Sequence, residues 1–369
     1  MYIEIDKKEL LNLIGKTLNI VEKRNTMPVL MNVLLEADGQ NLKVFATDLE
    51  VSLTDQSPAK VNTPGKVAVS AKALFDIAKE LGDGRISLTR KENNWLEIRQ
   101  GRYQSKIVGI SAEEYPVFPT FTGQGFAEIP GPVLREMIDR TVYSVSNDET
   151  RYHLNGVYFE QKGDAGYTMV ATDGHRLSLI QKKLPAQKLM TQGQGVIIPR
   201  KGLNEIKKLL DSLEGPFEVA IEGSQMILRN SNTTLMIRLI EGKYPNYSQF
   251  IPQNLKKKIT IHRDSFLTSL KRVSLLANQK SKAITLSIAD GKMEIASNNP
   301  ELGDAKEEIE VEYAGQDLRI GFNAKYIQDV LTAMTEEKVD FEINDQLSPG
   351  LIRPHNDPAY TCVVMPMRI

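Results

Sequence analysis

The chain of 369 residues predicts an α+β fold made of three tandem copies of one domain, each with antiparallel sheets and two helices. Three observations lead to this prediction. Similar segments recur in the same order at intervals close to 123 residues, one third of the chain. Strand-like runs alternate apolar and polar residues. Each third also contains two segments with the periodicity of an amphipathic helix.

The first recurring segment is a strand that ends in a turn. It is found at residues 42–48 (LKVFATD), 167–173 (YTMVATD) and 292–298 (KMEIASN). Its alanine, at positions 46, 171 and 296, recurs at intervals of 125 residues. A Thr or Ser and then an Asp or Asn follow in each copy, and these residue types are typical of turns.

Two further segments recur in the same order. A helix start with lysine at its third position is found at 70–77 (SAKALFDI), 199–206 (PRKGLNEI) and 323–330 (NAKYIQDV). A closing pair with proline is found at Tyr115-Pro116, Tyr244-Pro245 and Met365-Pro366. Three such coincidences at near-constant spacing indicate a triplicated domain. The predicted domains are 1–125, 126–252 and 253–369.

The first copy illustrates the predicted order of elements. An opening helix over about 7–21 places its apolar residues on one stripe: Leu10, Ile14, Leu18 and Val21. Strand-like runs follow at 29–36 and 42–53, and then the helix that contains Lys72. More strands are predicted at 85–90, 95–99 and 103–110. In the third copy, the opening helix should bury Phe266, Leu270, Val273 and Ala277 and expose Ser265, Ser269 and Arg272.

The charge balance at first argues against a DNA-binding protein. The chain has 46 basic and 47 acidic side chains and a net charge of -1, whereas DNA-binding proteins usually have a basic excess. The charges are sorted by face, however. The outer face of the opening helix has Lys8, Lys16 and Lys23, whereas six of the twelve residues at 301–312 are acidic. A neutral chain can therefore present a local basic surface.

Secretion and membrane insertion are not expected. Cys362 is the only cysteine, so no intrachain disulfide is possible, and its apolar surroundings predict a buried thiol. The N-terminus has no basic segment followed by an apolar run. No apolar run approaches the roughly 18–20 residues that span a bilayer. The cytoplasm is the expected location.

Motifs for catalysis or cofactor binding were sought and not found. The histidines at 153, 175, 262 and 355 have no metal-ligand spacing, so no metal or cofactor is predicted. Asp173 and His175 in ATDGHR could transfer protons. The equivalent turns, ATDLE and ASNNP, lack the histidine, which favours a turn or binding site. An enzyme that uses this pair remains one alternative, and a triplicated scaffold that does not encircle DNA is another.

Four motifs together resemble the bacterial sliding clamps, the β subunits of DNA polymerase III: NTMPVLMN (25–32), RYHLNGV (151–157), ATDGHRL (171–177) and VVMPMRI (363–369). The resemblance covers the whole chain. It implies three DNA-clamp domains per chain and a head-to-tail homodimer that closes into a six-domain ring, with helices inside and sheets outside. Such a ring encircles duplex DNA, tethers the replicative polymerase and has no active site. Its location is the cytoplasm, on the nucleoid when loaded.

The resemblance also implies three sets of functional residues. The DNA-contacting set is Arg24, Lys72, Asp148, Tyr152 and His153, of which Asp148 departs from the family because an anion repels phosphate. The cleft for partner peptides is Leu154, Thr172, Gly174, His175, Arg176, Leu177, Pro245, Phe250, Val363, Val364, Met365, Pro366, Met367 and Arg368. The implied peptide partners are the polymerase III alpha subunit, the clamp loader, other polymerases and repair factors. The candidate dimer interface is Ile107, Leu275 and Leu276.

Overall fold

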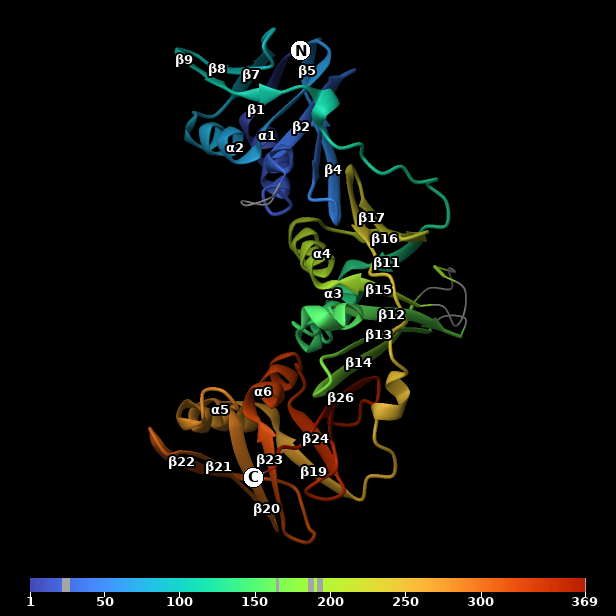
Figure 1. The fold of residues 1–369 in the computed structure, drawn as a ribbon, viewed down its shortest axis with the longest axis vertical. Helices are drawn as coiled ribbons and strands as arrows, with labels where there is room; N and C mark the ends of the chain where they lie inside the picture. The colour runs from blue at the N-terminus through green and yellow to red at the C-terminus, as the bar shows by residue number, and fades with distance from the viewer. Residues whose placement is uncertain (22–26, 164–165, 185–188, 191–194, 369) are drawn as a thin grey trace. The chain divides into compact units, whose positions relative to one another are not determined.

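The computed structural model describes residues 1–21, 27–163, 166–184, 189–190 and 195–368 (Figure 1). Six α-helices are found in this part of the chain, two in each predicted copy: α1 (Lys7–Thr17), α2 (Ala71–Glu80), α3 (Gly131–Asp139), α4 (Arg200–Ser212), α5 (Arg263–Val273) and α6 (Ala324–Thr332). None of the helices in these ranges is long and apolar enough to cross a membrane.

The contacts divide the chain into two compact units. Unit 1 consists mainly of Met1–Pro132 and Lys201–Leu239, and unit 2 mainly of Val133–Ala186, Met190–Arg200 and Ile240–Ile369. The middle copy is therefore shared between the units. The reason is that each large sheet continues from one copy into the next, so the strands of the middle copy pair with both neighbours.

Unit 1 contains two antiparallel sheets. The five-stranded sheet has the order β5 (Lys60–Thr63), β1 (Tyr2–Asp6), β7 (Arg85–Arg90), β8 (Leu96–Gln100) and β9 (Tyr103–Ile107). The nine-stranded sheet has the order β10 (Gly109–Ile110), β6 (Gly65–Ser70), β2 (Asn32–Asp38), β3 (Asn41–Thr47), β4 (Val51–Pro58), β18 (Thr233–Arg238), β17 (Gln225–Asn230), β16 (Pro216–Glu222) and β11 (Ala127–Pro130). The pairing of Leu53 with Leu235 joins the first copy to the second.

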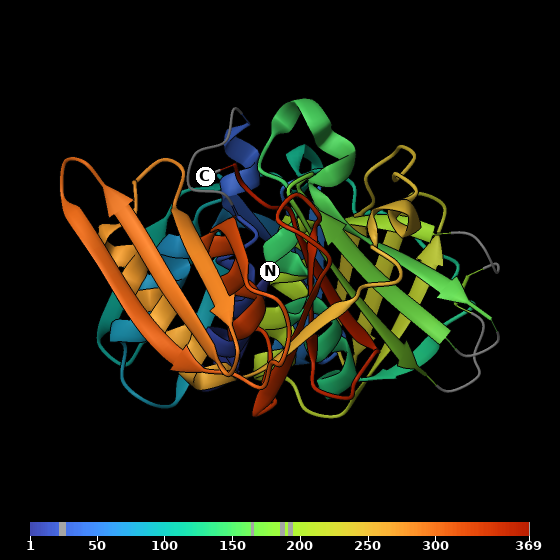
Figure 2. The same cartoon turned by 90° about the horizontal axis from the view of Figure 1, so that it is seen from below.

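Unit 2 repeats this plan. Its eight-stranded sheet has the order β15 (Gly195–Pro199), β12 (Gly156–Lys162), β13 (Gly166–Thr172), β14 (Arg176–Lys183), β26 (Tyr360–Val364), β25 (Gly350–Pro354), β24 (Lys338–Ile343) and β19 (Lys257–His262). Its four-stranded sheet has the order β22 (Gly303–Glu310), β21 (Lys292–Asn299), β20 (Ala283–Ala289) and β23 (Leu318–Asn323). Helix α5 packs on β21 and β22 and lies behind the orange sheet in Figure 2.

The core of the first copy lies between its two helices and its sheets. Buried residues of α1, such as Leu10 and Ile14, pack with Leu74 of α2 and with strand residues such as Ile3 and Val44. Asp6 caps α1 by accepting a hydrogen bond from the Lys8 amide, and Ser70 caps α2 through the Ala73 amide. The apolar stripe of the opening helix is thus confirmed, although the helix ends at Thr17 rather than near residue 21.

Several predicted element boundaries were wrong. The run 42–53 is two strands, since a turn at residues 48–50 separates β3 from β4. The run 29–36 begins as a 3-10 helix (Pro28–Met31), and the run 103–110 breaks at Val108, where the chain passes from the five-stranded to the nine-stranded sheet. Ser269 was expected to be exposed but is buried, because its hydroxyl donates to Glu307 of β22.

Candidate functional site

The turn between β13 and β14 forms the centre of the predicted cleft in unit 2. The Asp173 carboxylate accepts hydrogen bonds from the amides of His175 and Arg176 at 2.9 and 3.0 Å. The Thr172 hydroxyl donates to the Arg176 carbonyl at 2.6 Å. Gly174 has φ +89°, a value that favours glycine, and a Cβ there would lie 2.9 Å from a guanidinium nitrogen of Arg151. The roles of Asp173 and Thr172 in this turn are therefore structural.

The C-terminal segment lies directly beside this turn. Strand β26 pairs with β14, which places Val363 opposite Leu177. The Met365 amide then donates to the His175 carbonyl at 2.9 Å, and the Met367 amide donates to the Gly321 carbonyl at 2.8 Å. Segments that are far apart in the sequence thus form one surface. The structure brings together the two motifs from which the cleft was predicted.

The floor of this surface is apolar. Leu154, Leu177 and Val363 belong to one buried cluster with Val170, Leu179, Ile197, Tyr244 and Tyr247. Pro245 is half-buried beside it, whereas the Phe250 and Met365 side chains are 53% and 44% exposed. Exposed Phe and flexible Met beside a buried apolar floor are typical of surfaces that bind peptides.

The polar residues at the two ends of the predicted cleft are open to solvent. His175, in the turn, and Arg368, near the chain end, are both exposed and do not belong to the buried apolar cluster. Pro366 and Met367 lie between the exposed Met365 and Arg368 and are half-buried. The predicted cleft residues therefore divide into an apolar floor and an accessible border.

Arg176 differs from the other predicted cleft residues because its polar atoms are already engaged. Its side chain is 10% exposed, and its guanidinium donates to Asp173 at 3.0 Å, to Asp329 of α6 at 2.7 Å and to the Tyr143 carbonyl at 2.6 Å. It also lies 4.6 Å from the centre of the Tyr326 ring. Burial lowers the pKa of Arg176, but the two carboxylates outweigh this effect and raise it. Arg176 therefore fixes the turn to α6 instead of offering donors to a ligand.

The sequence reasoning missed three residues that position this turn: Tyr143, Tyr326 and Asp329. Asp329 follows Lys325 by one helical turn, and the two form an ion pair. The repeat alignment placed Lys325 on a helix, but the contact with Arg176 joins segments 153 residues apart. The opposite charges of Arg176 in ATDGHR and Asp329 in AKYIQD were the signal in the sequence, but opposite charges alone do not show which two residues meet.

A buried polar network lies next to Arg176. The Tyr143 hydroxyl is 2.7 Å from that of Tyr360 and 3.3 Å from the Cys362 sulfur, and it accepts a hydrogen bond from Ser178 at 2.6 Å. Cys362 is buried, as predicted, and its burial raises the pKa of the thiol. Among the described residues, no three His, Cys, Asp or Glu side chains are grouped in a way that could hold a metal ion.

Comparison with known proteins identifies the family to which the chain belongs. Family models of the DNA polymerase III beta subunit match the N-terminal domain at residues 1–119, the central domain at 128–246 and the C-terminal domain at 248–368. The beta sliding clamps of Caulobacter vibrioides and Pseudomonas aeruginosa are 33% and 34% identical, with 100% of both chains covered in each case. The chain belongs to the DNA polymerase III beta subunit family, the beta sliding clamps.

Solved structures of clamps agree with this assignment. The crystal structure of the DNA polymerase III subunit beta from P. aeruginosa has a TM-score of 0.94 at 34% identity, and the sliding clamp of Bacillus subtilis has 0.95 at 28%. The former covers 100% of both chains, and the latter match covers 100% of this chain and 99% of the other. A P. aeruginosa clamp bound to griselimycin has a TM-score of 0.93 at 33% identity, with 100% of both chains covered. This chain is a DNA sliding clamp, a processivity factor for DNA polymerase.

The face of unit 1 that corresponds to the predicted cleft of unit 2 is covered by its own chain. Strand pairing makes Met236 the counterpart of Val363, because it pairs with Ser52 as Val363 pairs with Leu177. In unit 1, Met236 packs with Ala220 and Ile227 against three aromatic side chains of the segment between β10 and β11, which we call the linker: Phe118, Phe121 and Phe126. The carboxylate of Glu222 holds the linker by accepting from the Thr122 amide and hydroxyl.

The described residues of the predicted DNA-contacting set belong to both units: Lys72 to unit 1, and the other three to unit 2. Arg24 lies outside the described residues. Lys72 is exposed on the first turn of α2 and pairs with Asp76 at 2.8 Å. Asp148, Tyr152 and His153 lie together in unit 2, at a 3-10 helix (Glu149–Leu154). The Tyr152 side chain is exposed, and its ring meets His153 edge to face at 5.7 Å.

Asp148 has a structural role at this helix. Its carboxylate accepts hydrogen bonds from the Thr150 hydroxyl and amide and from the Arg151 guanidinium, at 2.6, 3.0 and 2.9 Å. The hydrogen bonds from the Thr150 hydroxyl and from Arg151 lower the pKa of Asp148 to about 2. Its negative charge is therefore compensated locally, which reduces the repulsion of phosphate expected from the sequence.

The helix lysines are less free than the sequence suggested. Lys16 was expected on an exposed basic face, but its side chain is 12% exposed and pairs with Asp55 at 2.7 Å. Lys201 pairs with Asp48, and Lys208 pairs with Glu205 at 2.7 Å. The expectation for Lys16 was wrong because the neighbouring strand β4 supplies a buried carboxylate.

The candidate interface residues lie at or beside sheet edges, one position in unit 1 and two in unit 2. Ile107 is the last residue of β9, an edge strand of the five-stranded sheet, and its side chain packs partly on the core. Leu275 and Leu276 belong to a short 3-10 helix (Ser274–Leu276) that follows α5. Leu275 is 77% exposed, whereas Leu276 is half-buried.

Proposed function

We propose that two copies of this clamp chain associate head to tail and close into a ring around duplex DNA. The ring would contain six domains, with the limits 1–125, 126–252 and 253–369 in each chain. The sheet edges support this arrangement. Strands β9 and β22 each end a sheet, and an edge strand with unpaired backbone groups is a ready template for pairing with another chain.

Charge and apolar surface favour contact between these same two edges. Strand β22 is rich in acidic residues, including Asp304 and Glu308, whereas β9 contains Lys106. The exposed Leu275 lies in the helix that contacts β22. Substitution of Leu275 by glutamate should therefore shift the mass in solution from about 83 kDa, twice the 41.3 kDa of one chain, to the monomer value. An unchanged dimer mass would contradict this interface.

The proposed mode of action on DNA is topological. A closed ring cannot leave a long duplex without opening, so strong contacts are unnecessary, and they would oppose sliding. The ion-paired lysines of α1, α2 and α4 fit this requirement because they leave only weak, salt-screened attraction for phosphates. No base readout is needed. Lys72, Asp148, Tyr152 and His153 remain the proposed contacts in the described part of the chain.

The proposed role of the cleft is to bind short peptides of polymerases, of the clamp loader and of repair factors. The single observation that supports it best is the meeting of the ATDGHRL turn with the C-terminal segment over an apolar floor. Met365 and Phe250 can repack around different apolar side chains. We further propose that the chain has no catalytic activity, since Asp173, the best candidate base, is used in holding its own turn.

Two experiments test this function. After loading by the clamp loader, the protein should stay on nicked circular DNA and leave when the circle is cut, whereas equal retention on both forms would contradict encirclement. In the second experiment, deletion of residues 365–369 should weaken binding of a polymerase-derived peptide without changing the dimer mass. Lys60→Ala, an exposed ion-paired position on β5, is the control. Unchanged peptide affinity after the deletion would refute the cleft assignment.

A further inference from the structure

One side of the predicted cleft is formed by residues 244–250, which we call the wall segment. Two predicted cleft residues, Pro245 and Phe250, belong to it, and Tyr247 lies between them at the start of a 3-10 helix. The Tyr247 side chain is buried in the same apolar cluster as Val363. The position of Tyr247 therefore affects both the floor of the cleft and the wall segment.

Two charged residues of β12 contact the Tyr247 hydroxyl. The hydroxyl donates a hydrogen bond to the carboxylate of Glu160, whose side chain is 10% exposed. The Lys162 ammonium group lies 3.1 Å from that carboxylate and 4.8 Å from the centre of the Tyr247 ring, and it donates to the hydroxyl. Burial raises the pKa of Tyr247, so the phenol keeps its proton and remains a donor. Neither Glu160 nor Lys162 belongs to the predicted cleft.

Ring contacts also join the wall segment to β12. The Tyr158 ring stacks on that of Tyr244, with centres 4.9 Å apart and planes 9° from parallel, and it lies 6.4 Å from the Tyr247 ring. These contacts keep the wall segment beside the strand. A hydrogen bond to an ionised group is stronger than one between neutral groups and more directional than a ring contact. The Glu160 carboxylate therefore determines where Tyr247 lies along β12.

Unit 1 has a glutamate at the same position, but its partner is different. The recurring strands align Lys43 with Thr168, and these residues pair with Glu36 and Glu160, so Glu36 is the counterpart of Glu160. Glu36 forms an ion pair with Lys66 of the neighbouring strand β6 at 2.9 Å. In unit 1 this glutamate is thus paired within the sheet instead of with the segment that lies over it.

The residue over this glutamate differs as well. The closing Tyr-Pro pairs align Phe118 with Tyr247, and phenylalanine has no hydroxyl to donate. The Phe118 ring meets that of Phe45 edge to face at 5.4 Å, and it packs with the other linker aromatics on the face around Met236. The copy with the Tyr247–Glu160 hydrogen bond has exposed side chains around its apolar floor, whereas the copy without it has this face covered by the linker.

We propose that Glu160 is a positioning residue of the partner cleft, which fixes the wall segment through the Tyr247 hydroxyl. This proposal rests on the peptide-binding function proposed above. Glu160 is buried and acts on a peptide only through Tyr247. Because the wall segment is fixed before a peptide arrives, binding does not include the cost of ordering it. Lys162 balances the charge of Glu160 beside the hydroxyl.

The test measures the affinity of the full-length protein for a polymerase-derived peptide by fluorescence anisotropy. Glu160→Ala should weaken binding about tenfold, the effect of losing a hydrogen bond to a charged group. Tyr247→Phe keeps the ring and should weaken it about fivefold. Glu160→Gln retains an acceptor for the hydroxyl and should stay within about twofold of the wild type. The double variant Glu160→Ala/Tyr247→Phe should bind no more weakly than Glu160→Ala, because both changes remove the same hydrogen bond.

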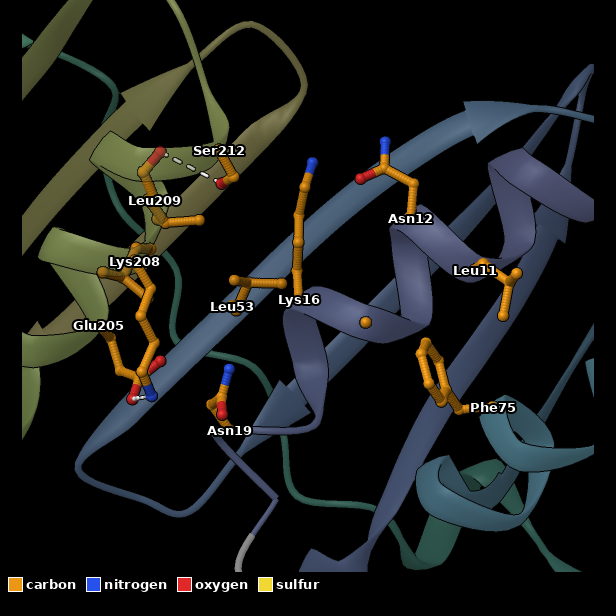
Figure 3. Close-up of a pocket in the computed structure, with 12 residues that line it drawn as sticks. Leu11, Asn12, Lys16, Asn19, Leu53, Phe75, Glu205, Lys208, Leu209 and Ser212 are labelled. Carbon is orange, nitrogen blue, oxygen red and sulfur yellow. Dashed lines mark hydrogen bonds and ion pairs between the residues drawn. The ribbon is translucent and has the colours of Figure 1, made fainter. Parts of the chain in front are cut away.

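Glu205→Ala in unit 1 is the matched control. Figure 3 shows Glu205 on α4 with its ion pair to Lys208, which has a length of 2.7 Å. The side chains of Glu205 and Glu160 are 9% and 10% exposed, and those of their lysine partners are 47% and 48% exposed. Glu205→Ala should leave peptide affinity unchanged even where it lowers the melting temperature. An equal loss of affinity in Glu205→Ala and Glu160→Ala would show general destabilisation and overturn the proposal.

The remaining outcomes separate the positioning role from the cleft itself. Unchanged affinity in Tyr247→Phe would overturn the positioning role, and this variant decides the question if Glu160→Ala does not fold. Equal losses in Glu160→Gln and Glu160→Ala would also overturn it, because glutamine retains the acceptor. If deletion of residues 365–369 weakens binding and the Tyr247 and Glu160 variants do not, the cleft is correct and the positioning role is wrong. If none of these changes alters the affinity, the cleft assignment is wrong as well.

Discussion

Replacement of Arg176 by methionine tests the idea that this residue fixes the cleft turn to α6. The change keeps an apolar side chain of similar length and removes three charge-assisted hydrogen bonds, to Asp173, Asp329 and Tyr143. Removing one partner of a buried ion pair costs about 3–5 kcal/mol. The lower end applies here, since Asp329 keeps Lys325 and Asp173 keeps the amides of its own turn.

The expected loss is therefore about 3 kcal/mol, which corresponds to a fall in melting temperature of about 6–12 °C for a unit of this size. Differential scanning calorimetry measures this change, and the transition that shifts should be that of unit 2. Lys338→Met is the matched control, because its ion pair with Glu312 is exposed and contributes at most about 1 kcal/mol. Affinity for a polymerase peptide should fall in Arg176→Met and stay unchanged in the control.

Two results would refute this reasoning. If Arg176→Met melts within about 2 °C of the wild type, a change of well under 1.5 kcal/mol, the guanidinium does not hold the turn. If stability is unchanged while peptide affinity falls, Arg176 contacts the peptide directly, as the sequence prediction assumed. The structure favours the positioning role because the side chain is only 10% exposed.

Three further predictions concern single positions. Gly174→Ala should weaken peptide binding and destabilise unit 2 by about 1 kcal/mol or more, because φ is +89° there, and unchanged urea unfolding would contradict this. Phe121→Ala should destabilise unit 1 by about 3 kcal/mol or less, because the half-buried ring packs on the nine-stranded sheet. Val117→Ala, at an exposed position of the same linker, should have little effect on urea unfolding. The Asp148 carboxyl should titrate at about pH 2 rather than 3.8, as measured by carbon NMR. Its contribution to stability is then complete above pH 3.8 and is lost as the pH falls through 2. A midpoint near 4 would show that its hydrogen bonds are absent.

The sequence by itself determined the threefold repeat and much of its internal structure. The spacing of ATD, ATD and ASN predicted equivalent strands, and the registers of the first two copies agree, since Ala46 pairs with Leu53 and Ala171 with Ser178. In the third copy the strand continues through Asn299, so Ala296 pairs with Lys306 across a longer hairpin. Helix caps at Ser70 and Asn323 depend on residues adjacent in the chain, so they were predictable. The two motifs of the predicted cleft, ATDGHRL and VVMPMRI, could also be recognised, because each is a continuous stretch of sequence.

The tertiary structure alone decided how the charges and the open surfaces are distributed. Lys16 was expected to be free on an exposed helix face, but a strand 39 residues further along buries Asp55 against it. The aromatic side chains of the linker cover the apolar face around Met236 in unit 1, whereas Phe250 and Met365 are exposed on the corresponding face of unit 2. These differences depend on contacts between distant segments, which a local sequence pattern does not encode.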